Sequence, residues 1–181
     1  MSAVPLAPLD EAVDHVRGPL DAHVIVEYGD YECPYSRRAF REIERVEHEL
    51  DGNVRVAFRH FPLTQIHPHA LAAATAAEAA ALQGRFWEMH TLLFDGQDAL
   101  EDDDLRRYAA EVGLDLARVD RDRTEPAVID RVRRDVESGL ETGAVRGTPT
   151  LFVDGMPHDG GYDADSLIAA LSVLSRRLPG R

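Results

Sequence analysis

A single cysteine, Cys33, and a complete lack of lysine set this sequence apart, since all 20 basic residues among its 181 are arginine. One cysteine excludes a disulfide within the chain, which favours a reducing compartment or a thiol kept for chemistry. The absence of lysine excludes catalysis through a lysine Schiff base. No apolar run approaches the roughly 20 residues that a membrane-spanning helix needs.

Positive charge is also scarce, and the formal net charge is -13 at pH 7. A negative charge of this size disfavours nonspecific binding to nucleic acid or to anionic membranes. The opening stretch MSAVPLAPLDEAVDH lacks the basic and apolar regions of a secretory signal. The sequence therefore predicts a cytoplasmic protein with neither a nucleic-acid nor a membrane partner.

Hydrophobic periodicity predicts a strand–helix–strand unit over residues 23–59. HVIVEY is a short β-branched run and indicates a buried strand. The next segment, 34–50, has apolar residues at helical spacing and Pro34 at its first position. NVRVAFRHF then alternates apolar residues with arginine, as a strand does. Residues 1–12 are expected to be irregular, and AVDHV, at 12–16, is a candidate edge strand.

Residues 67–143 are predicted to be entirely helical. HPHALAAATAAEAAALQG favours a helix that is apolar nearly all round and therefore buried. Three further helices follow, with a short one expected at 115–122. The last of the long helices has four apolar residues expected on one face: Ile129, Val132, Val136 and Leu140.

Strand character returns in TPTLFVDGMPHDG, where Asp154-Gly155 is typical of a type I′ hairpin turn. An amphipathic helix with Asp163 as its cap is expected to close the chain. Its inward residues should be Leu167, Leu171 and Leu174.

Taken in order, these stretches resemble the DsbA-like branch of the thioredoxin superfamily. The motifs that carry the resemblance are VEYGDYECPYS, FRHFPL, HPHALAAATAAEAA, GRFWEMHTLLF and GTPTLFVDG, and they cover residues 23–162. The resemblance implies an α/β, thioredoxin-like fold with an inserted all-helical domain. Residues 1–66 and 144–181 would form the discontinuous thioredoxin-like domain, and 67–143 the helical insertion.

Cys33 precedes Pro34 at the predicted start of a helix, where backbone N–H groups and the helix dipole favour a thiolate. Thiol–disulfide exchange needs that thiolate. Judged alone, a lone cysteine is usually a small buried apolar residue. Its place at a strand–helix junction and the GTPT motif favour a reactive nucleophile.

Ser36 stands where most members of the resembled family carry a second cysteine. A serine hydroxyl does not attack a disulfide at neutral pH, but it can donate a hydrogen bond to a thiolate. Cys33 would then form a mixed disulfide that only an outside thiol can release. Two other interpretations stay open here: an ordinary residue of a helical first turn, and a serine introduced to trap intermediates.

Three further positions take roles by resemblance. Glu27, inside the first strand, would move protons from beneath the active-site helix, although a partly exposed acid paired with arginine fits the sequence equally well. Pro34 and Tyr35 would shape the active loop. Thr148 and Pro149, with a cis peptide bond between them, would face an extended substrate segment.

The negative charges of Asp30 and Glu32 oppose a thiolate at Cys33, and nearby arginines offset them. His60, His67 and His69 suggest a metal, but no cysteine or carboxylate cluster accompanies them at ligand spacing, so no metal site is expected. The acidic run EDDD is better explained as a helix start than as a calcium loop.

The sequence thus predicts a thiol-disulfide oxidoreductase or isomerase that works through the single nucleophile Cys33. It would bind no cofactor tightly and would use a low-molecular-weight thiol as co-substrate. Its partners would be protein or small-molecule thiols and disulfides, and a homodimer is left open. Two alternatives are a glutathione-type transferase that uses the Ser36 hydroxyl and a non-catalytic peptide-binding module.

Overall fold

A five-stranded sheet forms the centre of the computed structural model, which describes residue 6 and residues 8–177. The strand order is β1-β3-β2-β4-β5, with β2 and β3 parallel and the other neighbours antiparallel. The elements in chain order are β1 (His15–Arg17), β2 (Val24–Gly29), α1 (Pro34–Glu49), β3 (Arg55–His60), α2 (Ala70–Ala81), α3 (Phe86–Asp95), α4 (Asp102–Glu111), α5 (Leu116–Asp122), α6 (Pro126–Glu141), β4 (Thr150–Val153), β5 (Met156–Pro157) and α7 (Ala164–Arg177). This is the thioredoxin-like α/β fold with helices inserted between β3 and β4 that the sequence predicts.

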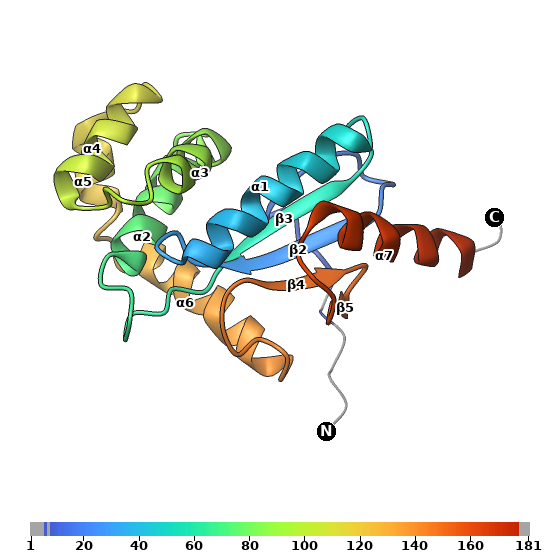
Figure 1. Cartoon of the computed structure of the whole chain (residues 1–181). Helices are drawn as coiled ribbons and strands as arrows, with labels where there is room; N and C mark the ends of the chain where they lie inside the picture. Colours follow the sequence, from blue (N-terminus) through green and yellow to red (C-terminus); the bar gives the residue numbers. More distant parts are fainter. Residues whose placement is uncertain (1–5, 7, 178–181) are drawn as a thin grey trace.

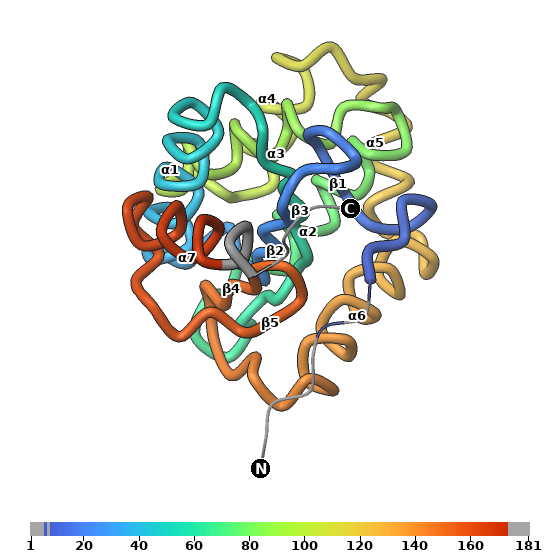
Figure 2. Tube along the Cα trace, turned by 90° about the vertical axis from the view of Figure 1, so that its right-hand side faces the viewer, coloured from blue at the N-terminus to red at the C-terminus, as the bar shows by residue number. Residues whose placement is uncertain are grey.

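Helices cover both faces of the sheet (Figure 1). On one face α1 and α7 lie side by side, and Ile25 of β2 packs there against Ile43 of α1 and Leu167 of α7. On the opposite face lies α6, where the Tyr28 hydroxyl is 2.8 Å from the Ser138 hydroxyl. Figure 2 shows the sheet between these two layers from the side. Alternation along β2 therefore places Glu27, like Ile25, on the face that α1 covers.

The remaining helices, α2 to α5, gather at one end of the sheet around a second core. Because nine of the twelve residues in α2 are alanine, that helix packs closely on all sides, as its composition predicts. Phe40 of α1 and Phe94 of α3 stack with ring centroids 5.0 Å apart. This contact joins the inserted helices to the helix that Cys33 precedes.

Most predicted elements are confirmed within two or three residues. The candidate edge strand is β1, at the edge of the sheet, and the short helix is α5. Asp154 and Gly155 both have positive φ, at 47° and 80°, as a type I′ turn requires. The Asp163 carboxylate accepts from the Ser166 amide at 3.0 Å and so caps α7.

The predicted apolar face of α6 is wrong in part. Leu140 is 57% exposed, and the buried residues of this helix include Val128 and Gly139. Gly139 is buried because α6 approaches Tyr28 so closely that a Cβ would lie 2.9 Å from its ring. The side chain of Leu174, expected to point inward, lies outside what the structure describes, as do the first five residues.

Both arginines of β3 are buried, although the alternating pattern would place them in solvent. Arg59 donates from Nε and Nη2 to the two oxygens of Asp14, each at 2.9 Å. Arg55 pairs with Glu11 and donates to the Gly18 carbonyl at 3.0 Å. The segment before and around β1 therefore covers this face, and its acids neutralise the buried guanidinium groups.

Candidate active site

The candidate site is built where β2 ends and α1 begins. Cys33 is the N-cap of α1, with extended backbone angles (φ -78°, ψ 120°), and Pro34 follows at the first helical position. The Cys33 carbonyl accepts the first helical hydrogen bond, from the Arg37 amide at 3.1 Å. Proline suits this position because the first turn has no intrahelical use for its missing N–H. The thiol is therefore at the positive end of a sixteen-residue helix.

Opposite the thiol lies the GTPT segment that leads into β4. The peptide bond between Thr148 and Pro149 is cis, as the resemblance implies. The Cys33 thiol donates to the Thr148 carbonyl, with Sγ 3.3 Å from the oxygen. The structure thus brings together Cys33, Thr148 and Pro149, which are far apart in the sequence.

The thiol is nearly buried, although the two residues after it are exposed. Cys33 is 3% exposed as a residue, whereas Tyr35 is 55% exposed and Pro34 is also exposed. The Arg38 guanidinium lies 5.7 Å from the centre of the Tyr35 ring. A disulfide that reaches Cys33 must therefore approach a nearly buried thiol beside the exposed Pro34 and Tyr35.

Ser36 is completely buried, and its hydroxyl oxygen accepts from the Asp30 amide at 3.2 Å. In the part of the chain that the structure describes, no hydrogen bond joins the Ser36 hydroxyl to the Cys33 thiol. Because the oxygen accepts from Asp30, the hydroxyl proton stays available for a different acceptor. The support that Ser36 would give to a Cys33 thiolate therefore stays a prediction.

Glu27 is 2% exposed and lies on the face of the sheet beneath α1. Burial raises the pKa of this carboxyl to about 8, and the charge of Arg17 only partly opposes that rise. One of its oxygens, Oε1, has no hydrogen-bond partner. Gly29 gives it room, because a Cβ there would lie 3.0 Å from that oxygen and 2.4 Å from a ring carbon of Phe58. Glu27 is therefore a buried acid, and not the partly exposed acid paired with arginine that the sequence also allows.

The Asp30 carboxylate is bonded to groups other than the thiol. This buried carboxylate accepts from the Glu32 and Leu63 amides, both at 2.8 Å, and pairs with His67 Nδ1 at 2.7 Å. Glu32 in turn accepts from the His69 amide at 2.6 Å and bonds His69 Nδ1 at 3.0 Å, which raises the pKa of that imidazole. The two acids therefore tie the active-site loop to the segment before α2.

Gln97, in the connection between α3 and α4, has a role that the sequence did not indicate. Its buried amide nitrogen donates to the Tyr31 carbonyl at 2.6 Å and to the Cys33 carbonyl at 2.9 Å. It holds the loop before α1 from the side of the inserted helices. No local pattern marks such a residue, because its partners lie more than 60 positions away.

Replacing Gln97 with leucine is expected to slow the reaction of Cys33 and to destabilise the chain. The substitution removes the donor to the buried Tyr31 carbonyl, which costs roughly 1–3 kcal/mol. The Cys33 carbonyl loses one of its two hydrogen bonds and keeps the one from the Arg37 amide. Urea unfolding and the rate of mixed-disulfide formation would measure the two effects. Gln83→Leu, at an exposed amide that bonds Asp115, is the control. Equal behaviour of the two variants would show that Gln97 does not hold the loop.

Comparison with known proteins agrees with this geometry. The family model described as Thioredoxin matches residues 10–172. A crystal structure of a thioredoxin-like oxidoreductase from Silicibacter pomeroyi is 28% identical, with a TM-score of 0.80, and the match covers 93% of this chain and 95% of that one. Wolbachia pipientis alpha-DsbA1 is 20% identical with a TM-score of 0.78, covering 95% and 94% of the two chains.

A curated relative is closer in sequence but much longer. The Na(+)/H(+) antiporter NhaA 1 of Mycolicibacterium vanbaalenii is 48% identical over 174 residues, which are 94% of this chain and 28% of the relative. The chain therefore spans little more than a quarter of that protein. No helix in the described residues is long and apolar enough to cross a membrane. The family match over residues 10–172, with the cysteine at a helix start opposite a cis-proline, shows that the chain belongs to the thioredoxin family and has the DsbA-like fold.

Proposed function

We propose that this chain is a thiol-disulfide oxidoreductase that works through Cys33 alone. The observation that carries the proposal is the thiol at the N-cap of α1, 3.3 Å from the Thr148 carbonyl beside cis-Pro149. The similarity to the Silicibacter pomeroyi protein, which is described as a thioredoxin-like oxidoreductase, supports the same reaction class.

The reaction has two balanced steps. The Cys33 thiolate attacks one sulfur of a disulfide, forms a mixed disulfide and expels the other sulfur as a thiolate. A second, outside thiolate then attacks the mixed disulfide, forms a new disulfide with the bound group and returns Cys33 to its starting state. No electrons are gained or lost overall, so the chain exchanges or isomerises disulfides. A low-molecular-weight thiol fits the second step, and a reducing cytoplasm would supply it.

Substrate binding would use the surface beside the thiol. An extended segment could lie along Thr148 and Pro149 as an added strand, with the exposed Tyr35 ring against it. The Glu27 carboxyl beneath α1 would accept or return the thiol proton, since its pKa of about 8 is close to neutrality. Ser36 is too deeply buried to activate a thiol in solvent, which argues against the transferase alternative.

The test is to incubate the protein with oxidised glutathione and to follow its intact mass. We expect one glutathionyl group per chain, released by added free thiol. A reduced dithiol peptide should not be oxidised catalytically, because nothing within the chain can resolve the mixed disulfide. A protein that never takes up the group would refute the proposal.

Replacing Ser36 with cysteine is expected to make the outside thiol unnecessary. The new thiol would stand three positions after Cys33, where it can attack the mixed disulfide within the same chain. Well-oriented intramolecular reactions of this kind reach effective molarities of roughly 10⁵ M or more. Oxidation of a dithiol peptide without added thiol would measure the gain. Ser36→Ala is the control, and the same turnover in both variants would contradict the expectation.

A second proposal concerns the partner. A relative named as a Na(+)/H(+) antiporter carries a segment 48% identical to nearly all of this chain. This supports an action on cysteines of an ion transporter. Trapping of mixed disulfides with the parent protein, in membranes with and without that transporter, would test it, with Cys33→Ala as the control that cannot form them. Failure there leaves the exchange reaction itself unaffected.

A further inference from the structure

Three potential metal ligands meet away from Cys33, where the edge of the sheet contacts α2. His15 comes from β1, His60 from the end of β3 and Glu78 from the middle of α2. One ligand atom from each lies within 4.8 Å of the other two. Glu78 Oε1 is 2.7 Å from His15 Nε2 and 2.8 Å from His60 Nε2.

This grouping differs from the three histidines that the sequence suggests. His67 is paired with Asp30 and His69 with Glu32, so neither joins His60. The two residues that do join it, His15 and Glu78, lie 45 and 18 positions away and share no motif with it. Sequence spacing therefore could not reveal the cluster.

The donor set suits zinc. Two imidazole nitrogens and one carboxylate oxygen, with a fourth position open to water, form a recurrent zinc coordination shell. Around a tetrahedral ion with bonds of about 2.0–2.2 Å, the ligand atoms lie about 3.3 Å apart. The distances of 2.7 and 2.8 Å here are those of hydrogen bonds, so each contact to Glu78 would lengthen by about half an ångström around an ion.

The charges are compatible with a divalent cation. Glu78 offers an anionic carboxylate oxygen to the ion, and both histidine Nε2 atoms lie against that same oxygen. A neutral imidazole binds an ion through Nε2 while its proton resides on Nδ1.

Arg131 is the one cation that approaches the cluster among the described residues, with Nε 4.0 Å from Glu78 Oε1. Its guanidinium is engaged elsewhere: Nη2 donates to the Val13 carbonyl at 2.8 Å, and Nη1 pairs with Asp135. Because Asp135 balances the charge of Arg131, the carboxylate of Glu78 remains to balance an added ion. The positive charge of the arginine would lower the affinity of the cluster for a cation.

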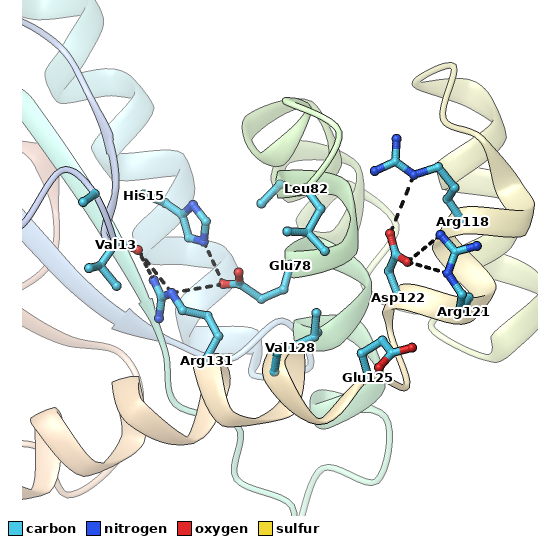
Figure 3. A pocket seen from close by; sticks show the side chains of 13 residues that line it. Val13, His15, Glu78, Leu82, Arg118, Arg121, Asp122, Glu125, Val128 and Arg131 are labelled. Carbon is cyan, nitrogen blue, oxygen red and sulfur yellow. Dashed lines mark hydrogen bonds and ion pairs between the residues drawn. The ribbon is translucent and has the colours of Figure 1, made fainter.

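An open path leads to the cluster. His15 and Glu78 line a cavity of about 540 Å³ between the sheet edge, α2, α5 and α6 (Figure 3). In that view the Glu78 carboxylate points from α2 toward His15 and into the cavity. On its other side the His15 ring is stacked on Phe86, with centroids 3.5 Å apart, which fixes the plane of the imidazole. A zinc ion, and a water molecule as its fourth ligand, can reach the cluster through the cavity.

We propose that His15, His60 and Glu78 bind one zinc ion, with the fourth coordination position open to the cavity. The ion would fasten β1 and β3 of the sheet to α2 of the inserted helices. The site is separate from the exchange chemistry, since Cys33 is not among its ligands.

The experiment titrates zinc alone into the Cys33→Ser protein, so that no thiol contributes a ligand. Calorimetry should give one saturable site per chain, and cobalt in place of zinc should give the intense visible absorption of a four-coordinate ion. Glu78→Gln and His15→Gln should each weaken binding by roughly tenfold to a hundredfold or more. Zinc should raise the melting temperature of the parent protein and not that of the two variants.

His158→Gln removes an imidazole from the β5–α7 connection, where its Nε2 contacts the Gly161 carbonyl, and is the matched control. It should bind zinc as the parent does. Both variants are expected to fold. Glu78→Gln keeps a carbonyl oxygen for the two histidines, and His15 lies near the surface. Circular dichroism would check that they do. Absence of a saturable site in the parent, or the same affinity in both variants as in the control, would overturn the proposal.

Discussion

Cys33→Ala should abolish mixed-disulfide formation, with a loss of roughly three orders of magnitude or more in the rate of exchange with a small disulfide. The expectation is this large because Cys33 is the only cysteine, so no other sulfur can replace it. A methyl group in its place cannot form the covalent intermediate. Intact-mass measurement after incubation with oxidised glutathione gives the result directly.

The same variant also separates the three candidate functions. Loss of exchange in Cys33→Ala with retention in Ser36→Ala would establish the cysteine as nucleophile. Retention of a glutathione-dependent activity in Cys33→Ala would instead favour a transferase. Binding of an unfolded peptide by both variants, without any exchange in the parent, would mean that the groove binds and the thiol is inert. The thermal unfolding of Cys33→Ala should stay close to that of the parent, since the change is small.

Glu27→Gln is expected to change the free energy of unfolding differently at high and low pH. Relative to the parent, the variant should gain about 3–5 kcal/mol more stability at pH 8.5 than at pH 4. Burial raises the pKa of this carboxyl from 4.5 to about 8 in the folded chain, whereas in the unfolded chain it titrates near 4.5. Between these values the folded state holds a proton that the unfolded state has lost. Stability therefore falls as the pH rises through this window, and each pH unit of it costs about 1.4 kcal/mol.

Below about pH 4.5 both states are protonated, so the carboxyl costs nothing through this linkage. Urea unfolding of parent and variant at several pH values between 4 and 9 would isolate the effect, because other groups cancel in the difference. Glu137→Gln, which removes an exposed carboxylate, is the control. A constant difference between the parent and Glu27→Gln across the range would contradict the buried, raised-pKa carboxyl. The predicted loss is a large part of the roughly 5–15 kcal/mol by which domains are usually stable.

The order and type of the elements could be predicted from the sequence because each depends on local patterns. The run around Val26, the helix after Pro34 and the turn at Asp154 all carry signals within a few residues. The predicted face of α6 is partly wrong because an apolar stripe is only one way to pack a helix. Close approach to Tyr28 requires Gly139, and Leu140 then turns outward.

The candidate site could be predicted only where a motif marks it. Cys33 and Pro149 are marked by their neighbours in CPYS and GTPT, and the structure brings them together. Gln97 and Asp30 hold the same loop through bonds to residues distant in the chain, so their importance follows from tertiary contacts alone. The burial of Glu27 cannot be decided from the sequence for the same reason, since a strand has two faces and only the packing of α1 determines which one is covered.

The place of β4 in the sheet constrains how this protein can be made. Val26 of β2 pairs with Phe152 of β4, although all the inserted helices lie between them in the chain. A ribosome therefore releases β2 long before its neighbour exists, and during that time one edge of β2 is without its partner. The inserted helices contact mainly one another and can form early, whereas the closing of the sheet must await the synthesis of β4. Synthesis that stops before residue 150 should leave a thiol-bearing segment without its opposing strand, exposed to any chaperone or protease nearby.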